Sequence, residues 1–118
     1  MGGRLALTTG AAAEQAVALF LAEQGWQVLA RNWRGAGGEL DLVVQQDGRL
    51  RFVEVKLRQT DDPVGLECVD GRKLLRVRRA AEAYLQDYQD LVLEACLMVA
   101  LVHGEPGSFR VHLFDDPD

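Results

Sequence analysis

The chain has 118 residues and a formal net charge of −5. This length suits one domain over residues 1–118, because two independent hydrophobic cores are hard to build from so few residues. No apolar run reaches the roughly 20 residues that span a bilayer, and the first residues lack the pattern of a secretory signal, so we expect no membrane association. The cysteines, Cys68 and Cys96, stand far apart, which favours a reduced, cytoplasmic protein.

The acidic balance argues mildly against a nucleic-acid partner, but the charge is unevenly distributed. Three of the last four residues are aspartates, whereas residues 72–79 hold five basic side chains and no acidic one. A phosphate backbone responds to the local charge of the surface that it meets. DNA therefore stays open as a partner.

The first half of the chain predicts a helix followed by three strands. Residues 10–24 carry apolar side chains at helical spacing, after a candidate N-cap at Thr9 and before Gly25. Residues 26–33 are rich in β-forming types. Residues 39–45 and 49–57 flank Asp47-Gly48, a dipeptide typical of a tight hairpin turn.

The second half predicts a helix and two further strands. Residues 59–69 have the composition of a loop, and Asp70 is a candidate cap for a helix over residues 71–88. The apolar run over residues 91–102 predicts a buried strand, and residues 109–114 alternate like an edge strand. The whole pattern predicts an α/β fold, with a mixed sheet and a helix on each side of its middle strands.

The Asp47-Gly48 turn fixes a register for the hairpin that it closes. Pairing Gln46 with Arg49 places Asp41 opposite Glu54. Because side chains alternate along a strand, Glu39 and Lys56 should lie opposite each other on the same face. The other face should be apolar and turned to the core; it consists of Leu40, Leu42, Val44, Val53, Val55 and Leu57.

Opposed carboxylates indicate a metal site, since like charges that face each other destabilise a sheet unless a cation lies between them. A surface hairpin with a Glu39–Lys56 ion pair is the plain structural alternative, but it explains Asp41 facing Glu54 poorly. Mg²⁺ or Mn²⁺ suits two such carboxylates, because these ions keep several waters and bind substrate phosphates. Glu14 borders the buried stripe of the first helix, so it either points to these carboxylates or marks the edge of the core.

These residues resemble the YraN-like family of the PD-(D/E)XK nuclease superfamily, which is similar to archaeal Holliday-junction resolvases. The likeness covers about residues 10–88 and rests on Gly10-x-x-x-Glu14, Gly25-Trp26, Arg31-Asn32-Trp33-Arg34, Gly38-Glu39-Leu40-Asp41-Leu42 and Phe52-Val53-Glu54-Val55-Lys56-x-Arg58. It implies a restriction-endonuclease-like αβββαβ core and a metal-dependent, structure-directed DNA endonuclease that acts on branched or recombining DNA.

The resemblance also implies a role for individual residues. Glu14 matches the helix carboxylate, and Asp41 and Glu54 match the two metal-binding carboxylates. The backbone carbonyl of Val55 would be a further metal contact, and Lys56 matches the catalytic lysine. Flanked by carboxylates, Lys56 should keep its proton and stabilise charge on the phosphate.

Basic residues further along the chain are candidates for DNA contact: Arg58, Arg72, Lys73, Arg76 and Arg79. The three arginines of the second helix form a stripe opposite its apolar face, and Lys73 lies nearer the core edge. A solvated basic face is the alternative for the stripe, and a water-exposed strand end is the alternative for Arg58. His103 and His112 have no evident partner in the sequence, so neither receives a role.

The chain departs from the family in the strand after the second helix, which usually carries Arg-Phe-Asp. Here Cys96-Leu97-Met98-Val99 holds neither charge, and no proline precedes Asp41. A second hypothesis is therefore a nuclease-fold module that binds nucleic acid or a protein partner without turnover. Resolvase-like relatives act as dimers, and the edge strand over residues 109–114 would offer a surface for a homodimer.

Overall fold

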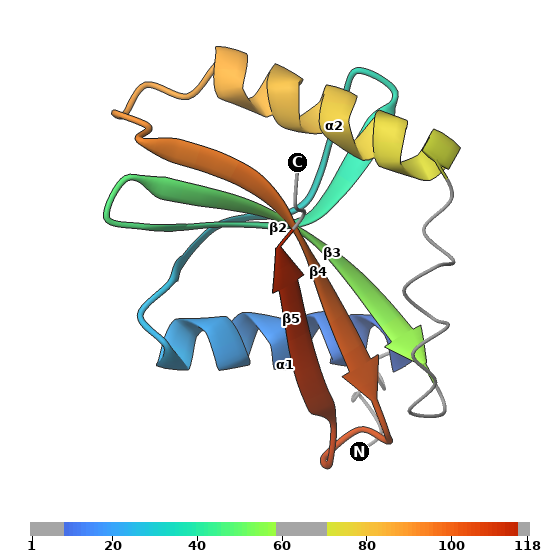
Figure 1. The fold of residues 1–118 in the computed structure, drawn as a ribbon. Coiled ribbons are helices and arrows are strands. Elements are labelled where there is room, and N and C mark those ends of the chain that lie inside the picture. The colour runs from blue at the N-terminus through green and yellow to red at the C-terminus, as the bar shows by residue number, and fades with distance from the viewer. Residues whose placement is uncertain (1–8, 59–70, 116–118) are drawn as a thin grey trace, which may run out of the picture.

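The computed structural model describes residues 9–58 and 71–115, and its elements follow the predicted order (Figure 1). They are α1 (Thr9–Glu23), β1 (Gln27–Gly35), β2 (Gly38–Gln46), β3 (Arg49–Arg58), α2 (Gly71–Gln86), β4 (Glu94–His103) and β5 (Arg110–Asp115). Cys68, the predicted loop over residues 59–69 and the predicted cap at Asp70 lie outside the described residues. Neither described helix is long and apolar enough to cross a membrane.

The strands form one sheet in the order β1-β2-β3-β4-β5. β3 and β4 are parallel, and the other neighbours are antiparallel. A parallel pair needs a crossover, which here contains α2. α2 covers one face of the sheet and α1 the other, as the yellow and blue helices of Figure 1 show. The predicted α/β fold with a mixed sheet and a helix on each side is confirmed, and it is the restriction-endonuclease-like fold.

Each helix covers its own hydrophobic cluster. On the α1 side Val17 and Leu21, one helical turn apart, are fully buried against the sheet. On the α2 side Val77 and Ala80 pack with Phe52 of β3. Helical spacing of apolar residues therefore predicted both helices, although α2 ends at Gln86, two residues before its predicted end. The two faces of β3 are covered by different helices.

The hairpin register is confirmed from the pair Gln46–Arg49 to the pair Leu42–Val53. The predicted apolar face is correct except at one end. The residues that pack on the α1 side are Leu42, Val44, Val53, Val55 and Leu57. Leu40 was expected among them but lies in the α2 cluster, so that prediction is wrong.

The alternation of β2 breaks at Asp41 because the neighbouring strand is irregular there. Asn32 stands between the pairs Arg31–Leu42 and Trp33–Leu40, and it has a left-handed φ of 50°. Asparagine tolerates this conformation better than most residues. The local twist turns Leu40 to one face of the sheet and Leu42 to the other.

The late apolar run forms its strand three residues after the predicted start. Leu91 and Leu93 are exposed, and the N–H of Leu93 donates to the carbonyl of Gly48 at 2.8 Å, beside the hairpin turn. β4 begins at Glu94, and from Leu97 onward it is largely buried as expected.

Gly38 allows β2 to approach α2 closely. A Cβ at this position would overlap the backbone carbonyl oxygen of Arg76 and lie 3.3 Å from the Cβ of Ala80. Backbone on both sides leaves little freedom to relax. The glycine therefore sets the distance between the start of β2 and the middle of α2.

We expect Gly38→Ala to lower the free energy of unfolding by about 1–3 kcal/mol, the usual cost of overpacking. Urea denaturation would measure it. Gly10→Ala is the control, since a Cβ at Gly10 in α1 meets nothing within 4 Å; it should be neutral or slightly stabilising. Equal effects of the two substitutions would contradict the close approach.

Candidate metal and catalytic site

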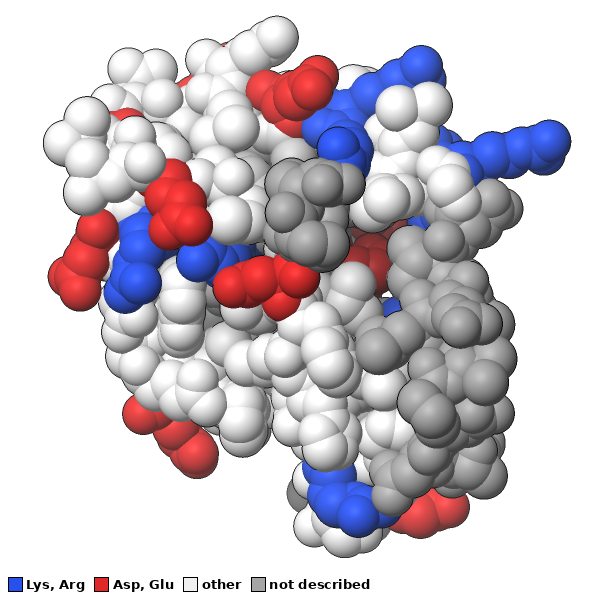
Figure 2. All heavy atoms as spheres, in the orientation of Figure 1, with Lys and Arg blue, Asp and Glu red and all other residues white. Residues whose placement is uncertain are grey.

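Charged side chains of both signs are spread over the face shown in Figure 2. Basic side chains project at the upper right, where α2 begins, whereas basic and acidic side chains lie side by side on the left and below. A protein with net negative charge thus presents a local basic surface beside α2.

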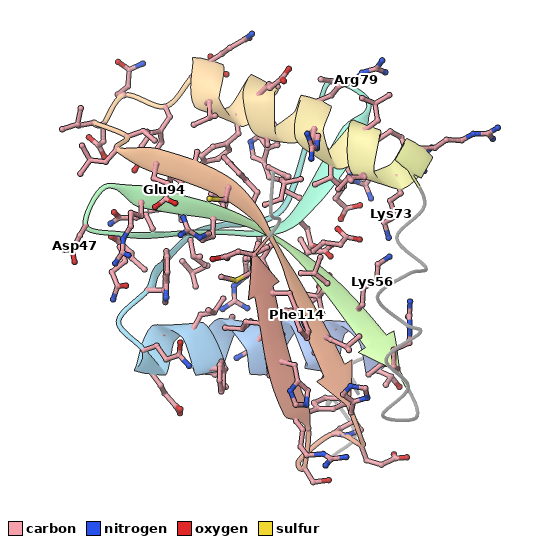
Figure 3. The ribbon with its side chains drawn as sticks, viewed as in Figure 1. Asp47, Lys56, Lys73, Arg79, Glu94 and Phe114 are labelled. Atoms are coloured by element: carbon pink, nitrogen blue, oxygen red, sulfur yellow. The ribbon has the colours of Figure 1, made fainter. Side chains whose placement is uncertain are left out.

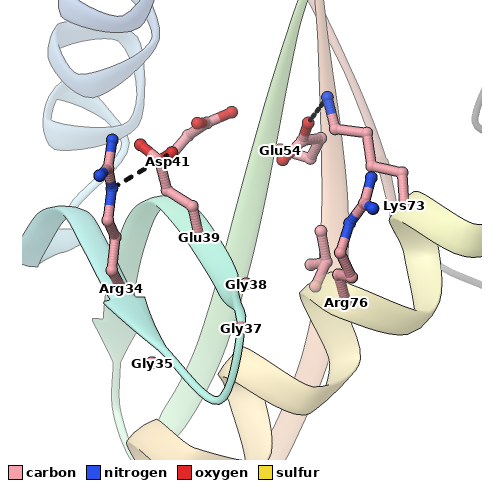
Figure 4. Close-up of a pocket in the computed structure, with 10 residues that line it drawn as sticks. Arg34, Gly35, Gly37, Gly38, Glu39, Asp41, Glu54, Lys73 and Arg76 are labelled. Carbon is pink, nitrogen blue, oxygen red and sulfur yellow. Dashed lines mark ion pairs between the residues drawn. The ribbon is translucent and has the colours of Figure 1, made fainter.

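A cleft of about 600 Å³ is lined by the β1–β2 turn, by β2 and β3, and by α2 (Figure 4). Its acidic residues come from β2 and β3, and its basic residues come from β1 and α2. The residues that line it are Arg34, Gly35, Gly37, Gly38, Glu39, Asp41, Glu54, Lys73, Arg76 and Val77. The cleft brings together the two carboxylates that the sequence singled out.

Asp41 is held by the backbone of the neighbouring strand. Its Oδ2 accepts a hydrogen bond from the N–H of Val55 at 2.8 Å. In a regular antiparallel ladder this N–H would donate to a β2 carbonyl. The side chain takes over that bond, and the paired positions of β2 and β3 stop at Leu42–Val53. The predicted direct opposition of Asp41 and Glu54 is therefore replaced by a splayed pair whose side chains still interact.

Burial, followed by the charge of Glu54, raises the pKa of Asp41 to about 7. The Val55 N–H works in the opposite direction by stabilising the ionised form, and the charge of Glu14 raises the pKa further. A carboxyl group this perturbed lies in a cleft where cationic compensation is incomplete. Such a group is a candidate for function.

Glu14 does reach the other carboxylates, which was one of its two predicted placements. It borders a smaller hollow of about 180 Å³ on the α1 side, together with Asn32 and Asp41. Burial and the charge of Glu39 raise its pKa, while hydrogen bonds with the Asp41 and Asn32 side chains lower it. Asp41 thus connects the α1 side of the sheet with the cleft on the α2 side.

Glu54 is shared by two lysines. Its carboxylate Oε1 lies 2.6 Å from Lys73 Nζ and 3.5 Å from Lys56 Nζ. The side chain of Glu54 is 10% exposed and that of Lys56 is 13% exposed, whereas that of Lys73 is 41% exposed. Figure 3 shows the two lysines approaching from different elements, Lys56 from β3 and Lys73 from α2.

The environment of Lys56 holds a second lysine as well as the predicted carboxylate. Burial, then the hydrogen bond and charge of Lys73, lower the pKa of Lys56, and Glu54 offsets this only in part. The register that would place Glu39 opposite Lys56 is not formed, because the paired positions of β2 and β3 stop at Leu42–Val53. The Glu39–Lys56 ion pair of the alternative explanation is therefore replaced by a Glu39–Arg34 pair at 3.7 Å. For Lys73, burial lowers the pKa, but the bond to Glu54 and its other contacts raise it above its ordinary value.

Sequence reasoning placed Lys73 among the DNA contacts and missed its bond to Glu54. The sequence predicted that Lys73 lies near the core edge of its helix, but it could not predict how closely α2 approaches β3. Of the other predicted contacts, Arg76 lines the cleft, and Arg72 and Arg79 are exposed on α2. Arg58 ends β3, where its Nη1 donates to the Leu57 carbonyl at 2.9 Å.

The donor set suits a hard divalent cation with an incomplete protein shell. Among the described residues, no three or more His, Cys, Asp or Glu side chains are spaced to hold a metal by themselves. Asp41 and Glu54 supply two carboxylates beside a cleft with room for water and substrate oxygens. Mg²⁺ is commonly bound in this way, through one or two carboxylates and several waters.

Fold and cleft together define a restriction-endonuclease-like α/β protein with a buried carboxylate–lysine cluster. The chain belongs to the uncharacterised protein family UPF0102, whose model matches residues 13–103. This confirms the resemblance to the YraN-like group.

Relatives in several bacteria match most of the chain. It is 50% identical over 102 residues to a UPF0102 protein of Synechococcus sp. (strain JA-3-3Ab), a match that covers 84% of this chain and 78% of the relative. It is 47% identical over 99 residues to a UPF0102 protein of Gloeobacter violaceus (81% and 79% covered). A UPF0102 protein of Neisseria meningitidis serogroup C is 39% identical over 102 residues (86% and 89% covered). These names give the family and no activity.

The raised pKa of Asp41 predicts a pH-dependent stability in the absence of metal. Its pKa is about 7 in the folded chain and ordinarily 3.8, so the folded state binds this proton more tightly. The resulting stabilisation is complete below the ordinary pKa and is lost as the pH rises through about 7. Asp41→Asn should flatten this decline and be more stable than the original chain at about pH 8.

Urea denaturation with a chelator present, at about pH 5 and about pH 8, measures the difference. Glu39→Gln is the control, because it removes a carboxylate from the same strand, where Glu39 is half exposed and paired with Arg34. If Asp41→Asn loses as much stability with rising pH as the original chain, the pH dependence does not come from the raised pKa of Asp41.

Proposed function

We propose that this chain is a metal-dependent, structure-directed DNA endonuclease that acts on branched or recombining DNA. The observation that carries the proposal is the Asp41–Glu54 carboxylate pair at a basic-walled cleft, with Lys56 beside it. Membership of a family with the PD-(D/E)XK pattern supports the reaction class, and the resolvase resemblance supports the choice of substrate.

The chain's own residues have distinct tasks in this proposal. Asp41, Glu54 and the Val55 carbonyl would hold Mg²⁺ or Mn²⁺, which when bound acidifies a water and neutralises phosphate charge. The Val55 N–H fixes the orientation of the Asp41 carboxylate. Glu14 steadies Asp41 from the α1 side through their hydrogen bond. Lys56, largely buried beside Glu54, supplies positive charge next to the phosphate or orients the water.

Nucleic acid would approach across the basic surface of α2 (Figure 2). Arg34 and Arg76 stand on opposite walls of the cleft, so a backbone phosphate that enters meets a cation on each side. Arg72 and Arg79 extend the surface along α2, and Arg58 extends it from the end of β3. Contacts of this kind give affinity without sequence specificity.

A binding module without turnover is the second candidate, and β4 favours it. Glu54 lies beside Val99 in the parallel register, and the apolar stretch from Cys96 to Val99 replaces the family's usual Arg-Phe-Asp. This strand therefore brings neither of those charges to the site. The same fold would then hold nucleic acid or a protein partner through the cleft alone.

Cleavage of branched, single-stranded and duplex DNA under titrated Mg²⁺ or Mn²⁺ separates the candidates. A nuclease should lose cleavage in Asp41→Asn and Glu54→Gln but retain it in Glu39→Gln. Lys56→Ala should keep metal and DNA binding while cleavage falls by roughly 10²–10³, the effect of losing one preorganised charge. No cleavage of any substrate by the original chain would leave the binding module, and cleavage unaffected by Lys56→Ala would remove the catalytic assignment.

The basic surface makes a separate prediction about salt. Replacing Arg72, Arg76 and Arg79 by Gln should weaken DNA binding and reduce the slope of log affinity against log salt by up to roughly 3, since each lost phosphate contact contributes about 0.9. Fluorescence anisotropy at several salt concentrations measures it. A triple replacement of the arginines at positions 31, 49 and 110 is matched in charge but lies on β1, β3 and β5. Equal slopes for the two triple variants would mean that the arginines of α2 face water and do not contact phosphates.

A further inference from the structure

We propose that Lys73 is a displaceable counter-ion of the metal site. Its ammonium group holds Glu54 in the absence of metal and leaves that carboxylate when a divalent cation binds. The inference rests on the proposed metal site and extends it, because it identifies what the cation must displace. Three features of the cleft carry it: the contact itself, the difference between the two lysines, and the space beside them.

The contact occupies one of the two carboxylate oxygens of Glu54, a proposed metal ligand. Lys73 Nζ lies 2.6 Å from Glu54 Oε1, at the short limit of a charge-assisted hydrogen bond. The Glu54 side chain is only 10% exposed, so water screens this bond weakly. A cation that arrives between Asp41 and Glu54 therefore competes with Lys73 for the negative charge of the Glu54 carboxylate, and it also repels the ammonium group.

The two lysines at Glu54 differ in their freedom to move. Lys56 projects from the middle strand of the sheet, is 13% exposed and stands 3.5 Å from Glu54 Oε1. Lys73 projects from the first turn of α2 and is 41% exposed. A lysine with a flexible stem and a partly exposed head reorients at little cost. Lys73 is thus the partner that leaves, and Lys56 is the partner that stays.

Space for the displaced ammonium group lies in the cleft itself. Lys73 already lines the cleft of about 600 Å³ whose walls carry Arg34 and Arg76 (Figure 4). An ammonium group released from Glu54 would face the same space as an incoming phosphate. The Lys73 charge therefore acts in both states of the site. It compensates the buried Glu54 carboxylate in the absence of metal, and it joins the other cations of the cleft when metal is bound.

A purely structural ion pair between α2 and β3 is the competing explanation. Removing such a pair would lower stability a little, as for other partly exposed pairs, and would not improve metal affinity. If Lys73 is a displaceable counter-ion, its removal should raise metal affinity, because the divalent cation no longer has to break the Lys73–Glu54 bond in order to bind. Metal affinity therefore distinguishes the two explanations directly.

The test is calorimetric titration of the full chain with Mn²⁺, comparing Lys73→Met with Arg76→Met. Both variants remove one positive charge from the cleft wall and keep an unbranched stem, but Arg76 makes no ion pair among the described residues. Lys73→Met should bind Mn²⁺ roughly tenfold more tightly, on the scale of one charge-assisted hydrogen bond. Arg76→Met should gain much less, because it changes only the surrounding potential.

Thermal melts with and without Mn²⁺ give a second measurement, in which Lys73→Met should gain more in Tm than the original chain does. Lys73→Gln replaces it if the methionine variant fails to fold. Unchanged Mn²⁺ affinity in the Lys73 variants, or an equal gain in Arg76→Met, would overturn the counter-ion while leaving the metal site intact. If the folded original chain and the Lys73 variants all fail to bind Mn²⁺, the proposed metal site falls together with the inference.

Discussion

The hydrogen bond from the Val55 N–H to the Asp41 carboxylate is the constraint on which the site depends. A side chain takes the place of a backbone partner, so β2 and β3 separate where a regular hairpin would continue. The separation lets Asp41 and Glu54 share a cleft instead of being pressed together across a ladder. The separation also keeps Glu39 from pairing with Lys56. Glu39 pairs with Arg34, and Lys56 pairs with Glu54.

Charge compensation around this bond is unequal. Both nearby ammonium groups gather at Glu54, while Asp41 accepts from the Val55 N–H and feels the charges of Glu54 and Glu14. The raised pKa of Asp41 follows from that imbalance. An arrangement that disfavours an ionised carboxylate costs folding stability at neutral pH, and proteins retain such costs mainly at functional sites. A divalent cation is the ligand that would relieve it.

The sequence predicted the features that hydrophobic periodicity and turn residues control. It did not predict the features that depend on tertiary packing. Element order, the hairpin register and the face shared by Glu54 and Lys56 follow from local spacing. The position of Leu40 does not, because a left-handed Asn32 in another strand breaks the alternation. The bond between Lys73 and Glu54 is equally hidden, since it depends on how closely α2 approaches the sheet. Family resemblance supplied the roles of residues, but it gave no account of which cation faces which carboxylate.

The packing of α2 against the sheet links the fold to the choice between enzyme and binding module. β4 places Val99 beside Glu54, so the second cation at this carboxylate comes from a helix instead of a strand. The position of α2 is set in turn by Gly38, whose missing Cβ admits the Arg76 carbonyl. If α2 holds Lys73 on Glu54 too firmly, the Glu54 carboxylate stays neutralised and the cleft can only bind. If Lys73 can leave, the same carboxylates become available to a metal. The two functions therefore differ less in which acidic residues are present than in how strongly one lysine is held.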